Sequence, residues 1–539
     1  MKKNTSKLLL ILLFVGVNTY SQTTWDGSES TNWDTAANWS TNSAPDFGYS
    51  GIITIPNVTN DPIINGTNIY ITANLEIAAD VVLTLNNGAI IQQIGGIISN
   101  SGSVILNSGS QIKTDGTASG NYTYNRNLAT TNWYLVTSPF IGQDVDDFVT
   151  AEGLETSGSN IALATYTTNG NTWAYYQSTD SGTGAFPSGT GYSIKLVSSG
   201  DVTFTGTFQA SDVSKTLTTT GQGYQLLGNP FASHIKSGEM LNASSILETK
   251  TLWVWNQSTS AYQSKNVGSA FQLAPTQGFI IQSNGTAGSL SIGESLQTTN
   301  TDTFQKQQIN EIFRIDLNLT DGTTIREAFL EYREGSTTGF DDGYDSPIFA
   351  GVSNPFTIYT HAVANGGGRD LEIQSLPDDN YENMIVPLGI NAVSGSEITI
   401  TPNITNIPTG IKIYIEDKED ESFTLLENSS SFRTTISSDM KGIGRFYIHT
   451  TSGVLGTGDI LLNNNLSVYT STRTNLRVVG VQKGIANIQL FDILGKQVLN
   501  TSFKGSNIND IVLPFLNNGI YIVNLKTDLG ILNKKISIK

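Results

Sequence analysis

The sequence contains no cysteine, which excludes disulfides, thiolate metal sites, a cysteine nucleophile and a lipid-modified N-terminal cysteine. Histidine is also scarce: the three histidines, His234, His361 and His449, lie far apart and lack the spacing of metal ligands. Charged residues make up only 14% of the chain, whereas glycine, asparagine, serine, threonine and β-branched residues are abundant. This mixture favours strands and tight turns over helices, so the sequence predicts an all-β protein.

Long apolar runs are missing except near the N-terminus. Lys2, Lys3 and Lys7 precede an apolar run over residues 8–17, and small or polar residues follow. This order is typical of a secretory signal peptide, and the run is too short to span a bilayer. We therefore expect residues 1–21 to be a signal peptide cleaved after Ser21, and no transmembrane segment elsewhere.

Positive charge is scarce in the body of the chain and concentrated at its end. The formal net charge is -17, yet residues 466–539 hold nine Lys or Arg against three Asp or Glu, a local charge of +6. Residues 22–465 carry -26. An acidic body of this kind is repelled by nucleic acid and by anionic membrane surfaces, so neither is an expected partner.

Residues 22–120 combine clustered tryptophans with a short repeat. Leu85-Asn86-Asn87-Gly88 recurs 21 residues later as Leu106-Asn107-Ser108-Gly109. Short apolar runs between Asn/Gly turns at this period predict a short β-solenoid. Trp25, Trp33 and Trp39 precede it, and they either stack on sugars or cap its open end; the adjoining solenoid favours capping.

A longer duplication covers residues 121–300. The segment NWYLVTSPFIG at 132–142 matches GYQLLGNPFAS at 223–233, and later aromatic and glycine positions match in the same order. The offsets are 91 residues for Pro139/Pro230 and 87 for Tyr175/Tyr262. We expect two similar β-modules, followed over 301–452 by an antiparallel β-sandwich with alternating apolar residues. A Gly-rich linker at 453–462 then leads to a closing module at 463–539.

The closing module carries an ordered set of motifs. IQLFDILGKQVL at 488–499 is followed by LNNGIYIVNLKTDLGILNKKISIK at 516–539. These residues resemble the C-terminal sorting domain of the type IX secretion system in flavobacterial and other Bacteroidota surface proteins, although the usual Tyr-Pro-Asn-Pro-like start is absent. The residues that carry the sorting signal in this resemblance are Gly495, Gly519, Tyr521, Lys534 and Lys535.

This resemblance implies an Ig-like fold and a secretion route. It implies export to the outer-membrane cell surface or the medium, with the type IX translocon and its processing machinery as partners. The sorting domain is typically removed, and the body is anchored to surface lipopolysaccharide or released. A simpler role for Lys534 and Lys535 is to block edge-to-edge strand pairing.

Two groups of residues in the body are candidate sites. The alternation of Trp173/Tyr175 and of Trp253/Trp255 places each pair on one face of a strand, where it forms either a carbohydrate-stacking platform or core packing. Asp341, Asp342 and Asp345 in FDDGYDS are candidate Ca²⁺ ligands, or else a solvated turn. No nucleophile elbow and no phosphate-binding loop were found, so no residue is assigned a catalytic role.

The sequence therefore favours a secreted adhesin or binding protein without catalysis, which recognises surface glycans or host or environmental polymers. It predicts no cofactor other than the candidate calcium. The alternative is a secreted polysaccharide-degrading enzyme, a lyase or glycoside hydrolase, or its carbohydrate-binding accessory. Against a lyase, Lys113 is the only basic residue between Gln22 and Gly120.

Overall fold

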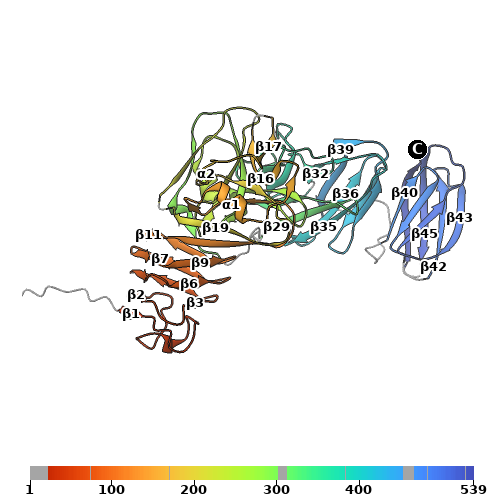
Figure 1. Ribbon diagram of the computed structural model, residues 1–539. Helices are drawn as coiled ribbons and strands as arrows, with labels where there is room; N and C mark the ends of the chain where they lie inside the picture. Colours follow the sequence, from red (N-terminus) through yellow and green to blue (C-terminus); the bar gives the residue numbers. More distant parts are fainter. Residues whose placement is uncertain are drawn as a thin grey trace, which may run out of the picture. The chain divides into compact units, whose positions relative to one another are not determined.

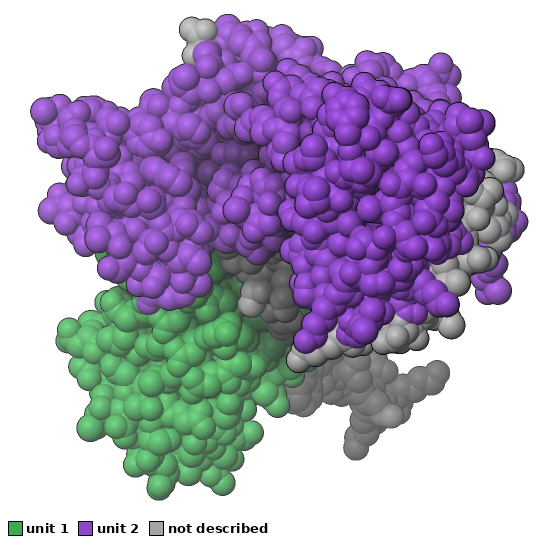
Figure 2. All heavy atoms as spheres, turned by 90° about the vertical axis from the view of Figure 1, so that its right-hand side faces the viewer, with its two compact units in different colours: residues 1–126, 203–210 green, residues 127–202, 211–539 purple. Residues whose placement is uncertain are grey.

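The computed structural model describes residues 22–72, 74–168, 170–209, 211–300, 312–382, 384–452, 466–481, 484–527 and 530–538. The expected signal peptide (1–21) and linker (453–462) lie outside the described residues. The fold is almost entirely β, with 53% strand and 5% helix, which confirms the predicted class. The chain divides into two compact units, residues 1–126 with 203–210 and residues 127–202 with 211–539, coloured green and purple in Figure 2.

The first unit is a parallel β-solenoid of about three turns. Its strands form three parallel ladders, visible as the red and orange rungs of Figure 1. Leu85 lies opposite Leu106, and Ile91 lies opposite Ile112. One 21-residue repeat of the sequence therefore forms one turn of the solenoid. One ladder has the order β1 (Gln22–Thr24), β2 (Ile52–Ile55), β5 (Leu75–Ile77), β8 (Ile97–Asn100), β11 (Thr117–Ser119); the second has the order β4 (Asn68–Ile71), β7 (Ile90–Gln93), β10 (Gln111–Thr114); the third has the order β3 (Ile63–Ile64), β6 (Val82–Leu85), β9 (Ser103–Asn107), β12 (Tyr122–Leu128). The sheet of the third ladder continues beyond β12 with β19 (Gly200–Phe208) and then β14 (Phe140–Ile141).

The three N-terminal tryptophans form one buried cluster around the 3-10 helix η1 (Ala36–Asn38). The Trp33 and Trp39 rings meet edge to face at 4.6 Å, and Trp25 packs on both. The indole N–H groups donate to backbone carbonyls, as in the 2.7 Å bond from Trp25 Nε1 to Asn60 O. Because the rings are buried, they cap the apolar interior of the solenoid and present no face for a sugar.

The duplication in the sequence appears as two sheets with the same strand order. In the first repeat β13 pairs with β18, β18 with β16, and β16 with β17; in the second, β21 pairs with β26, β26 with β23, and β23 with β24. Each repeat also has one short helix. The first repeat comprises β13 (Tyr134–Val136), β14 (Phe140–Ile141), α1 (Val145–Ala151), β15 (Thr156–Ser157), β16 (Asn160–Thr167), β17 (Thr172–Gln177) and β18 (Tyr192–Ile194). The second comprises β20 (Val213–Thr216), β21 (Tyr224–Gly228), β22 (His234–Lys236), α2 (Ser237–Ala243), β23 (Leu247–Asn256), β24 (Ala261–Asn266), η2 (Val267–Ser269), β25 (Gln272–Leu273), β26 (Gly278–Ser283), β27 (Ser289–Ile292), η3 (Glu294–Leu296) and β28 (Gln297–Thr298).

The next stretch forms an 11-stranded sheet that curls over one core. Leu426 on β37 and Phe432 on β38, from opposite ends of the strand order, belong to the same buried cluster. The alternating burial of β29 is the pattern of a strand with one buried face. Strands β30 and β33 pair in parallel, and the other strand pairs described in this sheet are antiparallel. The strands are β29 (Phe313–Thr320), β30 (Ile325–Arg333), β31 (Ser346–Pro347), β32 (Thr357–Thr360), β33 (Leu371–Pro377), β34 (Met384–Ala392), β35 (Glu397–Thr405), β36 (Lys412–Asp417), β37 (Ser422–Leu426), β38 (Phe432–Thr435) and β39 (Met440–Thr451).

The closing module is a two-sheet sandwich with its own core. One sheet has the order β40-β41-β44 and the other β43-β42-β45-β46. Val478 from the first sheet and Val523 from the second are fully buried in one cluster. Among the described residues, no helix is long and apolar enough to cross a membrane. The strands are β40 (Ser467–Thr472), β41 (Asn475–Val479), β42 (Ile485–Asp492), β43 (Gln497–Lys504), β44 (Ile508–Val512), β45 (Gly519–Thr527) and β46 (Gly530–Ile538).

Candidate functional site

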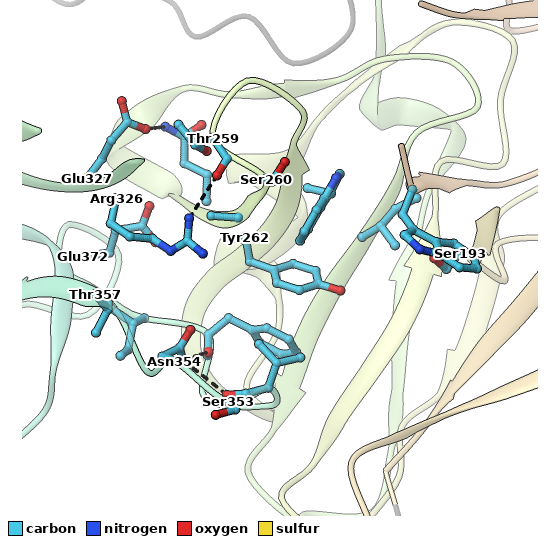
Figure 3. Close-up of a pocket in the computed structure, with 18 of the residues that line it drawn as sticks. Ser193, Thr259, Ser260, Tyr262, Arg326, Glu327, Ser353, Asn354, Thr357 and Glu372 are labelled. Carbon is cyan, nitrogen blue, oxygen red and sulfur yellow. Dashed lines mark hydrogen bonds between the residues drawn. The ribbon is translucent and has the colours of Figure 1, made fainter. Parts of the chain in front are cut away.

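A cavity of about 320 Å³ opens within the second unit, and aromatic, aliphatic and polar side chains line it. Both repeats and the 11-stranded sheet contribute to its wall (Figure 3). A volume near 300 Å³ lies at the lower end of the range for small-molecule pockets. The cavity is therefore large enough for a small ligand.

Equivalent strands of the two repeats supply its aromatic walls. Tyr175 on β17 and Tyr262 on β24 correspond in the duplication, 87 residues apart, and both line the cavity. Tyr175 packs against Trp133 with ring centroids 5.9 Å apart, and Tyr262 meets Trp255 edge to face at 5.0 Å. Trp173, two residues before Tyr175 and on the same strand face, extends the first wall.

The loop that follows β31 forms another part of the wall. The Phe349 ring is buried and lies 4.4 Å from the Tyr262 ring. Asn354 holds this loop closed, since its Nδ2 donates to Phe349 O at 3.0 Å. The Tyr166 hydroxyl donates to Gly351 O at 3.0 Å and ties the loop to the first repeat. A fixed backbone in this loop fixes the shape of the pocket.

Three charged groups complete the lining, and they come from β30 and β33. Arg326 Nη1 donates to Thr259 O at 2.9 Å, and Glu327 Oε2 accepts from Gln263 Nε2 at 3.4 Å (Figure 3). Glu372, only 5% exposed, accepts from Ser264 N at 2.9 Å and also from the Ser264 hydroxyl. The ring of Tyr262 extends between these groups and Ser193, with its hydroxyl on the Ser193 side (Figure 3).

Burial controls the protonation of these groups. It raises the pKa of Glu372 and of Glu327, and for Glu327 the nearby Asp316 carboxylate raises it further. Burial also lowers the pKa of the neighbouring Lys265, whose Nζ donates to Gln263 Oε1 at 2.9 Å. The pocket thus places two carboxyl groups with raised pKa values, those of Glu327 and Glu372, beside apolar ring faces.

Three of the four predicted stacking residues line this cavity, and one does not. Trp173, Tyr175 and Trp255 are half-buried and reach the pocket. Trp253 has no exposed surface, packs against Phe349 at 5.7 Å, and donates through Nε1 to Pro347 O at 3.0 Å. Of the two roles expected for this pair, Trp253 has core packing, because the loop after β31 covers it.

The three predicted calcium ligands face different backbone amides. Asp341 accepts from Thr337 N at 2.6 Å and Asp342 from Lys250 N at 2.7 Å. Asp345 is fully buried and accepts from the N–H groups of Ser375 at 2.5 Å and of Asp341 at 2.7 Å. In the part of the chain that the structure describes, no three His, Cys, Asp or Glu residues are grouped so that they could hold a metal ion. These carboxylates order the loop by accepting hydrogen bonds from backbone N–H groups.

The predicted sorting residues divide into residues that shape the fold and residues on its edge. Gly495 has a φ of +82° in the turn after β42, a conformation that favours glycine, and Gly519 begins β45. Tyr521 is buried, and its hydroxyl donates to Asn517 O at 2.9 Å. Lys534 and Lys535 are half-buried on β46, which is an edge strand of its sheet.

Sequence reasoning missed the contribution of the 11-stranded sheet to the pocket. Phe349, Arg326, Glu327 and Glu372 lie 60 to 200 residues from the aromatic pairs in the chain, and no local pattern marks them. Trp133, which lies within the matched segment 132–142 of the first repeat, was a further signal in the sequence that pointed to the pocket. The duplication itself could have indicated that Tyr175 and Tyr262 occupy equivalent positions.

Two stretches of the chain match known protein families. A family model described as "Domain of unknown function (DUF8693)" matches residues 24–272, and one described as "Secretion system C-terminal sorting domain" matches residues 457–539. A comparison with curated proteins found none that matches. Among solved structures, the chain is similar to one titled "Biofilm associated protein - BSP domain", with 7% identity, 77% of this chain and 92% of that chain covered, and a TM-score of 0.15. A TM-score this low carries no argument.

The sorting-domain match fixes the broad destination of the protein. It agrees with the resemblance found in residues 488–539 and supports a substrate of the type IX secretion system. The protein is accordingly secreted or displayed at the cell surface, and its sorting domain implies contact with the secretion machinery.

Proposed function

We propose that this secreted or cell-surface protein is an adhesin-like binding protein that recognises carbohydrate through the aromatic pocket. The supporting observation is that half-buried rings from equivalent strands of the two repeats, Tyr175 and Tyr262, line one cavity together with Trp133, Trp173 and Trp255. Aromatic faces stack on the apolar faces of sugar rings. The hydroxyl groups at the edge of the sugar ring need hydrogen-bonding partners from the protein.

The polar lining suits the edge of a sugar ring. Ser193, Ser260, Ser353 and Asn354 lie around the cavity and offer donors and acceptors. Arg326 is already oriented by its bond to Thr259 O. Groups held in place before binding lose little conformational entropy when a ligand arrives.

A glycan array followed by calorimetry tests this proposal. The whole protein is screened on the array, and the best oligosaccharide is titrated into wild type, Trp173→Ala and Trp255→Ala. Each variant should lose about tenfold or more in affinity, about 1.4 kcal/mol, because one stacking face is removed. Phe47→Ala is the matched control, since Phe47 is an exposed aromatic residue outside the pocket.

The proposal fails if the array shows no binding, or if both tryptophan variants bind the selected oligosaccharide as tightly as wild type does. A loss of affinity in Phe47→Ala equal to that of the pocket variants would also contradict it, because stacking would then lie elsewhere.

The alternative function, polysaccharide hydrolysis, is favoured by one observation. Two carboxyl groups, Glu327 and Glu372, line the same pocket, and burial raises the pKa of both. Glycoside hydrolases use a pair of carboxyl groups, one of them with a raised pKa. One observation is against catalysis: the carboxylate of Glu372 already accepts hydrogen bonds from the backbone N–H and the hydroxyl of Ser264.

An assay for new reducing ends separates the two functions. If the pocket is a hydrolase, the selected oligosaccharide is cleaved, and Glu372→Gln abolishes cleavage while binding is kept. If it is a binding site, no product forms with wild type at any time, and this is the expected result.

A further inference from the structure

Large apolar side chains protrude from the surface of the sorting domain. Ile493 is 73% exposed, Leu494 89%, Val512 73% and Phe515 92%. Isolated exposed apolar residues are ordinary, but a group of large ones in a folded domain marks an interaction site. The sorting domain has a complete core of its own, so these four side chains are not needed to fill it.

The strand register brings these side chains to one end of the domain. Asp492, the last residue of β42, pairs with Tyr521 near the start of β45. The turn with Ile493 and Leu494 and the loop with Phe515 therefore lie at the same end of this sheet. Val512 ends β44, three residues before Phe515. We call these four residues the apolar end; the domain is the blue one in Figure 1.

Both loops of the apolar end are held by hydrogen bonds. Asp492 Oδ1 accepts from the backbone N–H groups of Leu494 and Lys496, each at 2.9 Å, and Gly495 N donates to Asp492 O at 2.9 Å. The other loop is held by the bond from the Tyr521 hydroxyl to Asn517 O and by Leu513 N donating to Thr474 O at 2.7 Å. A fixed backbone that points apolar side chains outward is preorganised for binding.

We propose that the apolar end is the surface by which the sorting domain docks transiently into an apolar cleft of a protein of the secretion machinery. The size of the surface favours a transient partner over a second copy of this chain. Four side chains of this kind offer roughly a few hundred Å² of apolar surface, below the roughly 800 Å² per partner of a stable interface. Residues 466–539 carry a net charge of +6, so a cleft with an acidic rim is complementary.

This assignment differs from the sequence-based sorting residues. Gly495 and Tyr521 are needed because they fix the two loops, whereas Leu494 and Phe515 make the contact. Lys534 and Lys535 lie on the edge strand β46, and Lys535 is paired with Glu421, which directly precedes β37 of the 11-stranded sheet, so neither lysine is assigned to the contact.

Export of the full chain tests the proposal in a bacterium that carries a type IX secretion apparatus. The variant is Leu494→Ser with Phe515→Ser, and the matched control is Ile485→Ser, because Ile485 is 74% exposed at the opposite end of β42. Immunoblots compare the periplasm with the cell surface and medium. We expect the exported amount of the double variant to fall at least tenfold with accumulation in the periplasm, and the control to be exported as wild type is.

Folding and self-association are measured on the same purified proteins. The double variant should keep the melting temperature of wild type, which separates lost docking from misfolding, and wild type should be monomeric at micromolar concentration. If the double variant is stably folded and exported at the wild-type level, the proposal is overturned. A wild-type dimer that the double variant loses, with export unchanged, would assign the apolar end to self-association and overturn it equally.

Discussion

Two tryptophans on the same strand show how position decides the role of a residue. Trp253 and Trp255 lie on one face of β23, yet only Trp255 reaches the pocket. Phe349 packs on Trp253 at 5.7 Å, and Ser264 stands opposite it in the neighbouring strand. Trp255, two residues further along, pairs with Tyr262 at the open end of the sheet. The alternation of the sequence fixes the face, and the covering loop determines which ring is available.

Substituting each tryptophan in turn separates these roles. Trp253→Ala should lower the free energy of unfolding by about 3 to 5 kcal/mol, because it leaves a large cavity in the core. Trp255→Ala should cost less than about 2 kcal/mol, because the ring is half-buried, while ligand affinity falls. Urea denaturation followed by circular dichroism measures both; equal losses of stability would contradict the assignment.

Asp345 predicts a pH dependence that arises from one buried carboxyl group. Burial raises its pKa to about 7, although two backbone N–H groups oppose the shift. The folded state therefore holds the proton at pH values where the unfolded chain, with an ordinary aspartate, has released it. Stability is highest below about pH 4, falls as pH rises, and levels off above about pH 7.

Between pH 5 and pH 8 this carboxyl should lower the free energy of unfolding by about 2 kcal/mol. Asp345→Asn cannot titrate, so the variant should lack this part of the slope even though its amide satisfies only one of the two N–H donors. Urea denaturation at pH 5, 6, 7 and 8 compares the two proteins. Parallel pH profiles for wild type and variant would show that Asp345 is ionised throughout.

At the scale of elements, the solenoid is held together by a ladder of asparagine side chains in addition to its apolar interior. Asn86 Nδ2 donates to Asn65 Oδ1 at 2.7 Å, Asn107 Nδ2 to Asn86 Oδ1 at 2.8 Å, and Asn125 Nδ2 to Asn107 Oδ1 at 2.9 Å. Each step joins consecutive turns at the same position. The Asn residue in each repeat therefore fixes the register between successive turns of the solenoid, in addition to favouring a turn of the backbone.

Removing a rung from the middle of the ladder should cost more than removing one at its end. Asn86→Ala deletes two side-chain hydrogen bonds, and we expect a loss of about 1 to 2 kcal/mol in the stability of the first unit. Asn65→Ala deletes only the bond to Asn86 and should cost about half as much. Thermal melting of both variants, with hydrogen exchange over residues 82–107 as a local readout, tests this order. A larger effect at Asn65 would contradict the ladder.

The duplicated repeats show a second effect at this scale. Each repeat alone presents one aromatic edge, and the pocket forms because β17 and β24 are both brought beside the loop that follows β31. The short helices also follow local rules: Asp144 caps α1, and its carboxylate accepts from the N–H of Asp146 at 2.8 Å. Asp144, Asp146 and Asp147 therefore mark the N-terminus of a helix.

At the scale of the whole molecule, separate cores imply separable functions. The buried cluster of the sorting domain contains only residues from 466 onward, and that of the 11-stranded sheet only residues between 313 and 448. A chain that ends at residue 452 should therefore keep its own fold. Among the described residues, those that line the pocket all lie before the sorting domain.

Truncation after residue 452 should abolish export and leave ligand binding intact. We expect the extracellular amount to fall at least tenfold in a bacterium with the type IX apparatus, because the sorting domain is absent. The truncated protein, purified from the periplasm or from a heterologous host, should bind the selected oligosaccharide within about twofold of the full chain, or about 0.4 kcal/mol. Normal export of the truncated chain would contradict the role of the sorting domain, and lost binding would contradict the independence of the pocket.

The sequence by itself determined the features that depend on neighbours in the chain or on a regular period. The 21-residue repeat fixed the turns of the solenoid, the 87- and 91-residue offsets fixed the paired modules, and the motifs of residues 488–539 fixed the sorting domain. Local periodicity and turn chemistry act over a few residues, so they leave a mark that can be read directly.

Only the tertiary structure decided which of those residues are available to a ligand or a partner. It buried Trp253, brought Glu327, Glu372 and Phe349 to the aromatic walls, and turned the carboxylate of Asp345 toward backbone amides. It also left Leu494 and Phe515 in solvent. The physical reason is that burial and contact depend on segments far apart in the chain, whose approach no local pattern encodes.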